Sequence, residues 1–551
     1  MLKPLSQGLK PLSQGLKPLS QGLKPLSQGP SARVRARLRL NGFAATARVR
    51  ARLRLNGFAA TARVRARLRP NGLGVGAVVL LAAVLDALCA FSRFHALSSG
   101  TYDLVIFDQA IRSYSHFHLP VALVKGVHNG FGPHFAVLGD HFSPILALLA
   151  PLYWIHDGPT TLLVAQSVLL ALAVVPLWIL ARRELGVLAA YAVALAYAVS
   201  WPVAEASVFD FHEVAFAPLV TAILFERLSA WRHAGAGRLW HVVAAAVVLL
   251  AVKEDMGLLL AGLGVAIAVR ERGRARLLGL GFVVGGLGFT ALATDVLIPA
   301  FGGRADYYWV YGRLGADPPA VAWHLVAHPL DSLHVLLTPD TKWHTLLWLL
   351  ALGALAPFAS PYLLAVVPLL AERMLADSPN WWGTEYHYNA FLVVPLLCAG
   401  VDGAARLTRR VGVGWAVVAL LVGLVSVPLF PFGGLADPAT WRQSPDARAA
   451  IRAAAAVPDG VLVEAVSPVG PRLTGRTRVL LWDRVERDAP WVVADVERPQ
   501  FPFCRLDDQR ARVARLEAEG YGVVYAERGF VVLHRAVTSP RLVAPPAPPC
   551  A

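Results

Sequence analysis

Acidic, histidine and lysine side chains gather in the connections between long apolar segments of this chain. These clusters are Asp103 and Asp108 in YDLVIFDQ, Asp140 and His141 in GDHFSP, Asp210, His212 and Glu213 in FDFHEVAF, and Lys253, Glu254 and Asp255 in KEDMG. Carboxylates and imidazoles serve as general acids and bases, and an ammonium group binds phosphate. If the apolar segments cross a bilayer, the clusters collect near one face, where they could form one site.

FDFHEVAF is the most specific of these motifs. It places Asp210, His212 and Glu213 among phenylalanines, directly before an apolar segment. Burial beside such neighbours raises the pKa of a carboxyl group toward that of a useful acid or base. The structural alternative is a capping box, in which Asp210 caps the next helix and Glu213 follows three residues later.

Asp103 and Asp108 are five residues apart and would lie about 140° apart on a helix. They would therefore not chelate a metal as a simple pair. A bent loop, or convergence with Asp210, would be needed to hold a divalent cation through oxygen ligands. Solvated loop carboxylates are the alternative, and the sequence leaves the cofactor unassigned.

KEDMG interrupts an apolar stretch of about 30 residues near its middle. Charges at such a place need partners or water. Lys253, Glu254 and Asp255 either hold helices together or, through Lys253, bind a phosphate group. His387 in EYHYNAF opens another apolar segment, where it could stabilise a leaving group or anchor the chain at the membrane interface.

The composition is that of a polytopic membrane protein. The mean hydropathy is +0.52, with 56% hydrophobic and 16% charged residues. We expect a mainly α-helical fold with about eleven spans, since about 20 apolar residues cross a bilayer. The expected spans are 73–91, 160–181, 186–203, 214–228, 239–252, 256–269, 277–298, 343–357, 361–371, 388–404 and 411–432.

The arginines predict the orientation. They concentrate in short connections, such as 182–183 and 270–276, that simple alternation places on the side of the N-terminus. Basic residues accumulate on the cytoplasmic side of membranes. We therefore expect an inside N-terminus, an outside C-terminus and the acidic clusters on the outer face.

The formal charge of +16 is a property of residues 1–72, which hold sixteen basic residues and no acidic ones. LKPLSQG occurs four times there and ARVRARLR three times. Proline, glycine and alternating arginine predict a disordered basic tail. The near-perfect copies also suggest a start assigned too far upstream, with the physiological start near 60–75. Because no aromatic residues alternate with the arginines to stack on bases, we expect no nucleic-acid partner.

The remaining chain divides into three parts. A transmembrane domain at 73–432 includes two long outer loops, 92–159 and 299–342, of which the first contains a helix at 142–155 lying on the surface. A small soluble α/β domain follows at 433–538, with a helix at 444–456 and the strand-like runs VLVEAV, RVLLW, WVVADV, GVVYA and FVVLH. A Pro-rich tail occupies 539–551. Cys504 and Cys550 could pair if that end is outside.

The series YDLVIFDQ, GDHFSPILALLAPLYW, FDFHEVAFAP, VKEDMG and EYHYNA resembles the DUF2079 family of bacterial membrane proteins over about 73–535. Its layout is similar to the GT-C superfamily of membrane glycosyltransferases. The resemblance implies a multi-pass protein of the bacterial cytoplasmic membrane that takes a sugar from a polyprenyl-phosphate donor at the outer face.

The same resemblance implies roles for residues. Asp103 or Asp108 would activate the acceptor or bind a metal, with Asp210, His212 and Glu213 as further catalytic candidates. Lys253 would meet the donor phosphate. The remaining candidates for substrate binding are Glu254, Asp255, Asp140, His141 and His387. A transporter or flippase, with Lys253, Glu254 and Asp255 at the membrane midplane, and a non-catalytic envelope scaffold are the alternatives.

Overall fold

The computed structural model describes residues 71–234, 239–304, 306–536 and 539–543. The basic repeats and the end of the Pro-rich tail lie outside the described residues. Residues 73–551 form one compact unit.

Within the described residues, six helices are long and apolar enough to cross a membrane. They are Asn71–His95, Pro159–Leu185, Val187–Val208, Glu213–His233, Gly273–Ala300 and Arg410–Leu429. Four of these helices contain breaks. The second consists of α5 (Pro159–Leu172) and α6 (Val174–Leu185), and the third of α7 (Val187–Ala198) and α8 (Trp201–Val208). The fourth consists of η3 (Glu213–Ala215) and α9 (Phe216–Ala234), and the fifth of α12 (Gly273–Leu292), η5 (Ala293–Leu297) and α13 (Ile298–Ala300). The last begins as α20 (Arg409–Ser426) and ends as η8 (Val427–Leu429).

The other five expected spans are helical but short. They correspond to α10 (Leu239–Leu250), α11 (Met256–Arg270), α16 (Asp340–Gly353), η7 (Pro361–Ala365) with α17 (Val367–Leu375), and α19 (Ala390–Ala405). The α-helices among them have 9 to 16 residues. At 1.5 Å per residue they fall short of a hydrocarbon layer of about 30 Å. The membrane-protein class is confirmed, while the count of eleven spans and the orientation stay predictions.

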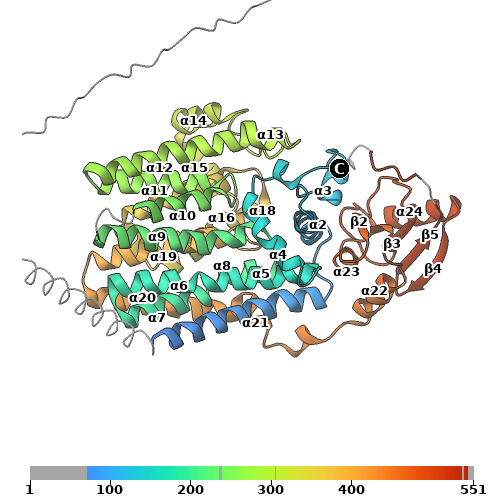
Figure 1. Cartoon of the computed structure of the whole chain (residues 1–551), viewed down its shortest axis with the longest axis horizontal. Coiled ribbons are helices and arrows are strands. Elements are labelled where there is room, and N and C mark those ends of the chain that lie inside the picture. Colours follow the sequence, from blue (N-terminus) through green and yellow to red (C-terminus); the bar gives the residue numbers. More distant parts are fainter. Residues whose placement is uncertain (1–70, 235–238, 305, 537–538, 544–551) are drawn as a thin grey trace, which may run out of the picture. The chain divides into compact units, whose positions relative to one another are not determined.

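The long helices lie roughly parallel in a bundle (Figure 1). At its centre is α19, in which all residues except Asp402 and Ala405 are buried. α11 and α12 approach closely through glycines, since a Cβ built at Gly286 would lie 2.3 Å from the carbonyl oxygen of Gly257. Small residues allow membrane helices to pack in this way.

The first long connection folds over one end of the bundle. It contains α2 (Leu104–Ser115), α3 (Leu123–His128), η1 (Val137–Gly139), η2 (Pro144–Leu149) and α4 (Ala150–Tyr153), so the helix expected at 142–155 forms as a 3₁₀ turn followed by a short α-helix. The second contains α14 (Pro318–Ala327) and α15 (Pro329–Leu337). Short elements complete the membrane part: η6 (Ala356–Ala359), α18 (Pro379–Trp382), α21 (Pro431–Gly434) and η9 (Pro438–Trp441).

The C-terminal part is a small α/β fold. After α22 (Pro445–Ala455) come β1 (Leu462–Ala465), α23 (Gly470–Leu473), β2 (Arg478–Leu481), β3 (Trp491–Asp495), α24 (Leu506–Ala518), β4 (Gly522–Glu527) and β5 (Phe530–His534). All five strand-like runs form strands, in the order β2-β1-β3-β5-β4. β1 is parallel to β2 and β3, whereas β5 is antiparallel to β3 and β4. Cys504 is disulfide-bonded, Cys89 and Cys398 are free, and Cys550 lies outside the described residues.

The sheet and α2 share one hydrophobic core. Val105 and Ile106 of α2 belong to the same buried cluster as Val463 of β1 and Val479 of β2. Figure 1 shows α2 and α3 between the helix bundle and the sheet. Apolar burial of this kind stabilises contact between parts at roughly 25 cal/mol per Å² removed from water. The first long connection is therefore held on both sides.

A buried carboxylate links the same two parts. Asp108 is 0% exposed and accepts hydrogen bonds from the hydroxyls of Tyr153 at 2.8 Å and Thr474 at 2.7 Å, and it forms an ion pair with Arg112 at 2.7 Å. Its oxygens are occupied by structural partners from α2, α4 and the segment after α23. Asp108 is thus an anchor between the membrane part and the soluble part.

We expect Asp108→Ala to destabilise the protein by about 3–5 kcal/mol, because it leaves the Arg112 guanidinium without its buried partner. Asp157→Asn removes the other, half-exposed partner of Arg112 and should cost less than about 1 kcal/mol. Thermal unfolding of the two variants in detergent measures the difference. Equal melting temperatures would contradict the anchoring role.

Candidate functional site

FDFHE connects α8 to η3 and lies against the start of the first long connection. The buried carboxylate of Asp210 accepts a hydrogen bond from the backbone N–H of Gly100 at 2.7 Å. Burial raises the pKa of Asp210 to about 6, against the opposing charge of Arg93. The capping alternative is not what forms, since the residue that precedes η3 is His212 and no side-chain cap is present. Asp210 instead joins two connections that are 110 residues apart in sequence.

This pKa predicts a pH-dependent stability. Between the usual value near 3.9 and about 6, the folded state holds a proton on Asp210 that the unfolded state has lost. The stability difference between wild type and Asp210→Asn should therefore shift against wild type as pH rises from about 4 to about 6, and then level off. Melting temperatures of both proteins across this range test it. A difference that does not change with pH would show that Asp210 ionises normally.

His212 has a defined tautomer. Its Nδ1 lies 3.0 Å from the carbonyl oxygen of Asp210, and a carbonyl can only accept, so Nδ1 carries the hydrogen. In the neutral ring Nε2 then presents a lone pair. Nε2 lies 3.7 Å from Oδ1 of Asp103, too far for a hydrogen bond. Asp103 and His212 thus face each other without a direct hydrogen bond between their side chains.

His387 covers the other side of His212. The two imidazoles stack with centroids 3.9 Å apart and planes at 22°, and Phe209 stacks on both rings. Burial, assisted by the nearby His212 and Lys253, holds the pKa of His387 well below its usual range. His387 is therefore neutral and forms a wall of the site rather than a second charge.

Lys253 supplies the positive charge of the cluster. Its Nζ lies 3.6 Å from Asp255 and 3.7 Å from Glu213. Burial disfavours its charge, but Asp255, Glu213 and Glu254 outweigh burial and hold the pKa of Lys253 above its usual range. Both contacts are longer than a hydrogen bond. The ammonium is therefore charged, with N–H groups still able to bind an anion.

The remaining predicted residues support this turn. The imidazole of His141 lies 2.6 Å from Glu254, whose other oxygen accepts the N–H of Phe142 at 3.0 Å. Burial raises the pKa of Glu254, but the charge and hydrogen bond of His141 together with the charge of Lys253 outweigh burial and lower this pKa to about 2. Asp140 is paired with Lys125 at 2.8 Å. Glu254, His141 and Asp140 therefore have their own partners and position the turn that carries Lys253.

Apart from Asp108, the predicted site residues thus fall into three groups, one of which consists of Glu254, His141 and Asp140 with their own partners. Asp103, Asp210 and His212 converge with His387, next to a second group of Lys253, Glu213 and Asp255. Asp108 does not join them, because its oxygens are bound by Arg112, Tyr153 and Thr474. Across the described ranges, no group of three or more His, Cys, Asp or Glu residues is arranged to hold a metal ion. Asp103 and Asp108 do not fit a divalent cation as a pair, because the oxygens of Asp108 are already occupied.

The structure adds charged residues that the sequence reasoning missed. The guanidinium of Arg93 lies 5.4 Å from the ring centre of Phe209, and its charge acts on Asp210. Arg373 is buried and donates to Asn389 at 2.8 Å and to the carbonyl of Trp381. Both arginines lie at the ends of apolar runs. An ionisable group at such a position is costly, and it could have identified both residues as candidates from the sequence.

The soluble part also reaches the site. Thr101 is 0% exposed, and its hydroxyl and N–H both donate to the carbonyl of Ser467, at 2.7 and 2.9 Å. Ser467 follows β1, and its hydroxyl, like the carboxylates of Asp210 and Asp103, lies within 4 Å of a Cβ built at Gly100. The loop after β1 therefore fixes the turn that positions Asp103.

Comparison with solved structures gives matches at low sequence identity. ArnT from Cupriavidus metallidurans bound to undecaprenyl phosphate is 14% identical, with 85% of this chain and 99% of that chain covered and a TM-score of 0.49. The oligosaccharyltransferase of Archaeoglobus fulgidus in complex with Zn and sulfate is 12% identical, with 83% and 73% covered and a TM-score of 0.46. No curated protein sequence matches the chain.

A family model for predicted membrane proteins matches residues 93–532. The match begins at Arg93, beside the candidate site, and ends in β5. It therefore contains the bundle connections that form the site and nearly all of the soluble part. The chain belongs to the DUF2079 family of predicted membrane proteins.

Proposed function

We propose that this protein is a membrane glycosyltransferase that uses a polyprenyl-phosphate-linked sugar at the membrane face carrying the Asp103 and Lys253 clusters. The observation that carries the proposal is a carboxylate and an imidazole that face each other next to a largely buried ammonium group. Asp103 faces Nε2 of His212, and the ammonium of Lys253, whose ion-pair contacts are 3.7 and 3.6 Å long, lies in the neighbouring cluster. Both clusters stand where apolar helices end, which suits a substrate with a lipid tail.

The Asp103 and His212 pair is the proposed base. Asp103 has a side chain 37% exposed, so it can meet an acceptor hydroxyl from the aqueous side, whereas His212 is only 14% exposed. As the hydroxyl oxygen forms a bond to the anomeric carbon, its proton passes to this pair. The hydrogen bond from Nδ1 of His212 to the Asp210 carbonyl keeps Nε2 directed at Asp103.

The bond that breaks joins the anomeric carbon to the phosphate oxygen. The oxygen keeps the electron pair and leaves as a lipid phosphate with one more negative charge. Lys253 stabilises this charge, because hydrogen bonds to ionised groups are roughly twice as strong as neutral ones. Glu213 and Asp255 hold the ammonium charged before the donor arrives.

The test is transfer by purified protein in proteoliposomes containing lipid extracts from the native membrane, followed by mass spectrometry of lipid-linked sugars and glycans. We expect consumption of a polyprenyl-phosphate sugar and appearance of a glycosylated product, both lost in Asp103→Asn. Envelope glycans of a deletion strain should lack the same modification. No change in any glycoconjugate, in vitro and in cells, would refute the proposal and favour the transporter or scaffold alternative.

A further inference from the structure

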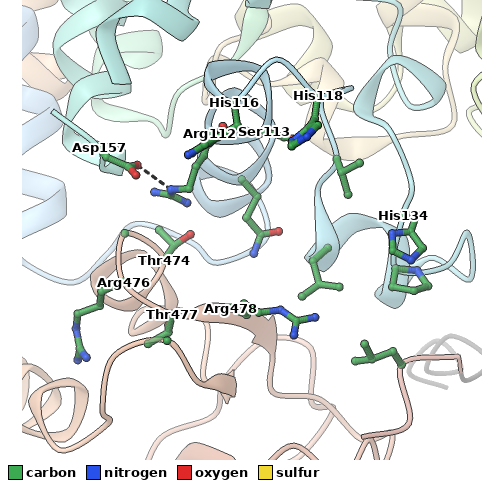
Figure 2. A pocket seen from close by; sticks show the side chains of 17 residues that line it. Arg112, Ser113, His116, His118, His134, Asp157, Thr474, Arg476, Thr477 and Arg478 are labelled. Atoms are coloured by element: carbon green, nitrogen blue, oxygen red, sulfur yellow. Dashed lines mark hydrogen bonds and ion pairs between the residues drawn. The ribbon is translucent and has the colours of Figure 1, made fainter. Parts of the chain in front are cut away.

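One cavity lies away from the candidate site. An open cleft of about 670 Å³ is bordered by the C-terminal half of α2, the segment 116–134 and the turn that leads into β2 (Figure 2). α2 has 12 residues and is about 18 Å long, with Asp103 before its first residue and the cleft at its far end. None of the clustered residues around Asp103 or Lys253 lines the cleft.

The lining of the cleft is basic. Its charged and histidine side chains are Arg112, His116, His118, His134, Arg476 and Arg478, and Asp157 is the one acid among the described lining residues. The hydroxyls of Ser113, Thr474 and Thr477 also border it (Figure 2). This composition favours an anion that also carries hydrogen-bonding groups.

Two of the three arginines are already engaged. Arg112 is paired with Asp108 and Asp157, at 2.7 Å each. Arg476 lies 2.7 Å from Asp459 and also donates to the carbonyls of Val457 and Ala454 at 2.6 Å. The charges of Arg112 and Arg476 are neutralised by these carboxylates. The two side chains therefore line the cleft without adding net positive charge.

Arg478 differs from both. It is exposed at the start of β2, and its guanidinium makes no hydrogen bond or ion pair with any residue that the structure describes. The same holds for the imidazoles of His118 and His134, on the opposite wall in Figure 2. A planar guanidinium binds carboxylate or phosphate through two parallel hydrogen bonds, and imidazoles add further donors.

We propose that this cleft binds an oxyanion carried by a carbohydrate of about disaccharide size, such as an acidic sugar or a sugar phosphate. A volume of about 670 Å³ is within the range of small-molecule sites and far exceeds that of a bare phosphate. Arg478 holds the anionic group, and the hydroxyl-bearing side chains meet the sugar. Since Arg478 belongs to the soluble part and His118 and His134 to the first long connection, the ligand bridges the two. The inference does not depend on the transferase proposal.

Isothermal titration calorimetry of the full chain in detergent tests this with digalacturonate, neutral cellobiose and inorganic phosphate. We expect digalacturonate to bind at least tenfold more tightly than either of the others, and to raise the melting temperature. Arg478→Gln should weaken its binding at least tenfold. Arg505→Gln, which removes an exposed arginine elsewhere on the soluble part, should leave it unchanged.

Three results would overturn the proposal: no binding of digalacturonate, equal binding of cellobiose or phosphate, or wild-type affinity in Arg478→Gln. If Arg478→Gln does not fold, the double variant His118→Gln, His134→Gln replaces it, and unchanged affinity there is equally decisive. Because binding is measured without turnover, this outcome is separate from that of the transferase assay.

Discussion

Asp103→Asn should lower the turnover number for sugar transfer by about 10²–10⁴-fold, the usual contribution of a general base. The amide has the same shape as the carboxyl group but cannot take the acceptor proton. The side chain is 37% exposed and its nearest charged partner is 3.7 Å away, so the fold should not depend on it. Initial rates over a range of donor concentrations should show a lower kcat at an unchanged donor KM.

Asp306→Asn is the matched control, since Asp306 is an exposed aspartate in the second long connection. It should transfer sugar at the wild-type rate. If Asp103→Asn also keeps the wild-type rate, Asp103 is not the base. His212→Gln separates the members of the pair, and a loss as large as that of Asp103→Asn would mean that they act as one unit.

Lys253→Met should weaken donor binding about 100-fold. A hydrogen bond between a charged donor and a charged acceptor contributes roughly 1.5–3 kcal/mol, and 2.7 kcal/mol corresponds to two powers of ten. The effect should appear both in the Kd of a lipid-linked donor and in kcat, because the same ammonium stabilises the leaving phosphate. Binding to the inactive Asp103→Asn background measures the Kd without turnover.

Removing Lys253 also leaves Glu213 and Asp255 without their cation, which could destabilise the turn. The double variant Lys253→Met, Glu213→Gln lowers that excess negative charge and should recover stability but not donor affinity. Lys253→Arg keeps the charge and should retain most of the affinity. Recovery of affinity in the double variant would show that Lys253 acts only in packing.

Much of the architecture follows from local sequence patterns. Six spans of the expected set are long apolar helices, and each of the five strand-like runs became a strand. Apolar runs and alternating strand patterns are visible in the local sequence, and burial in lipid or in a sheet stabilises these elements directly. The lengths of the short helices were harder to predict. By hydropathy α10 and α11 both look like membrane spans, but the KEDMG turn between them limits their length.

The candidate site was only partly predictable, because local sequence patterns do not show which distant segments come into contact. FDFHE and KEDMG are visible because charge among apolar residues is costly and therefore informative. Asp103 and Asp108 are both acidic residues in the same apolar motif, so the sequence did not distinguish them. Asp108 became an anchor because its side of α2 meets Thr474 and Tyr153, whereas Asp103 faces His212. Nothing in the sequence indicated the contact between Thr101 and Ser467, because these two residues are 366 positions apart.

The sequence alone determined the class of this protein and the chemical types that gather at its helix ends, because hydropathy and charge act residue by residue. Tertiary structure decided which charges have partners. It paired Glu254 with His141, left the Lys253 ammonium with only long ion-pair contacts, and left Arg478 unpaired within the described chain. Ion pairing depends on distances of a few ångströms between segments far apart in sequence, and only the packed fold sets those distances.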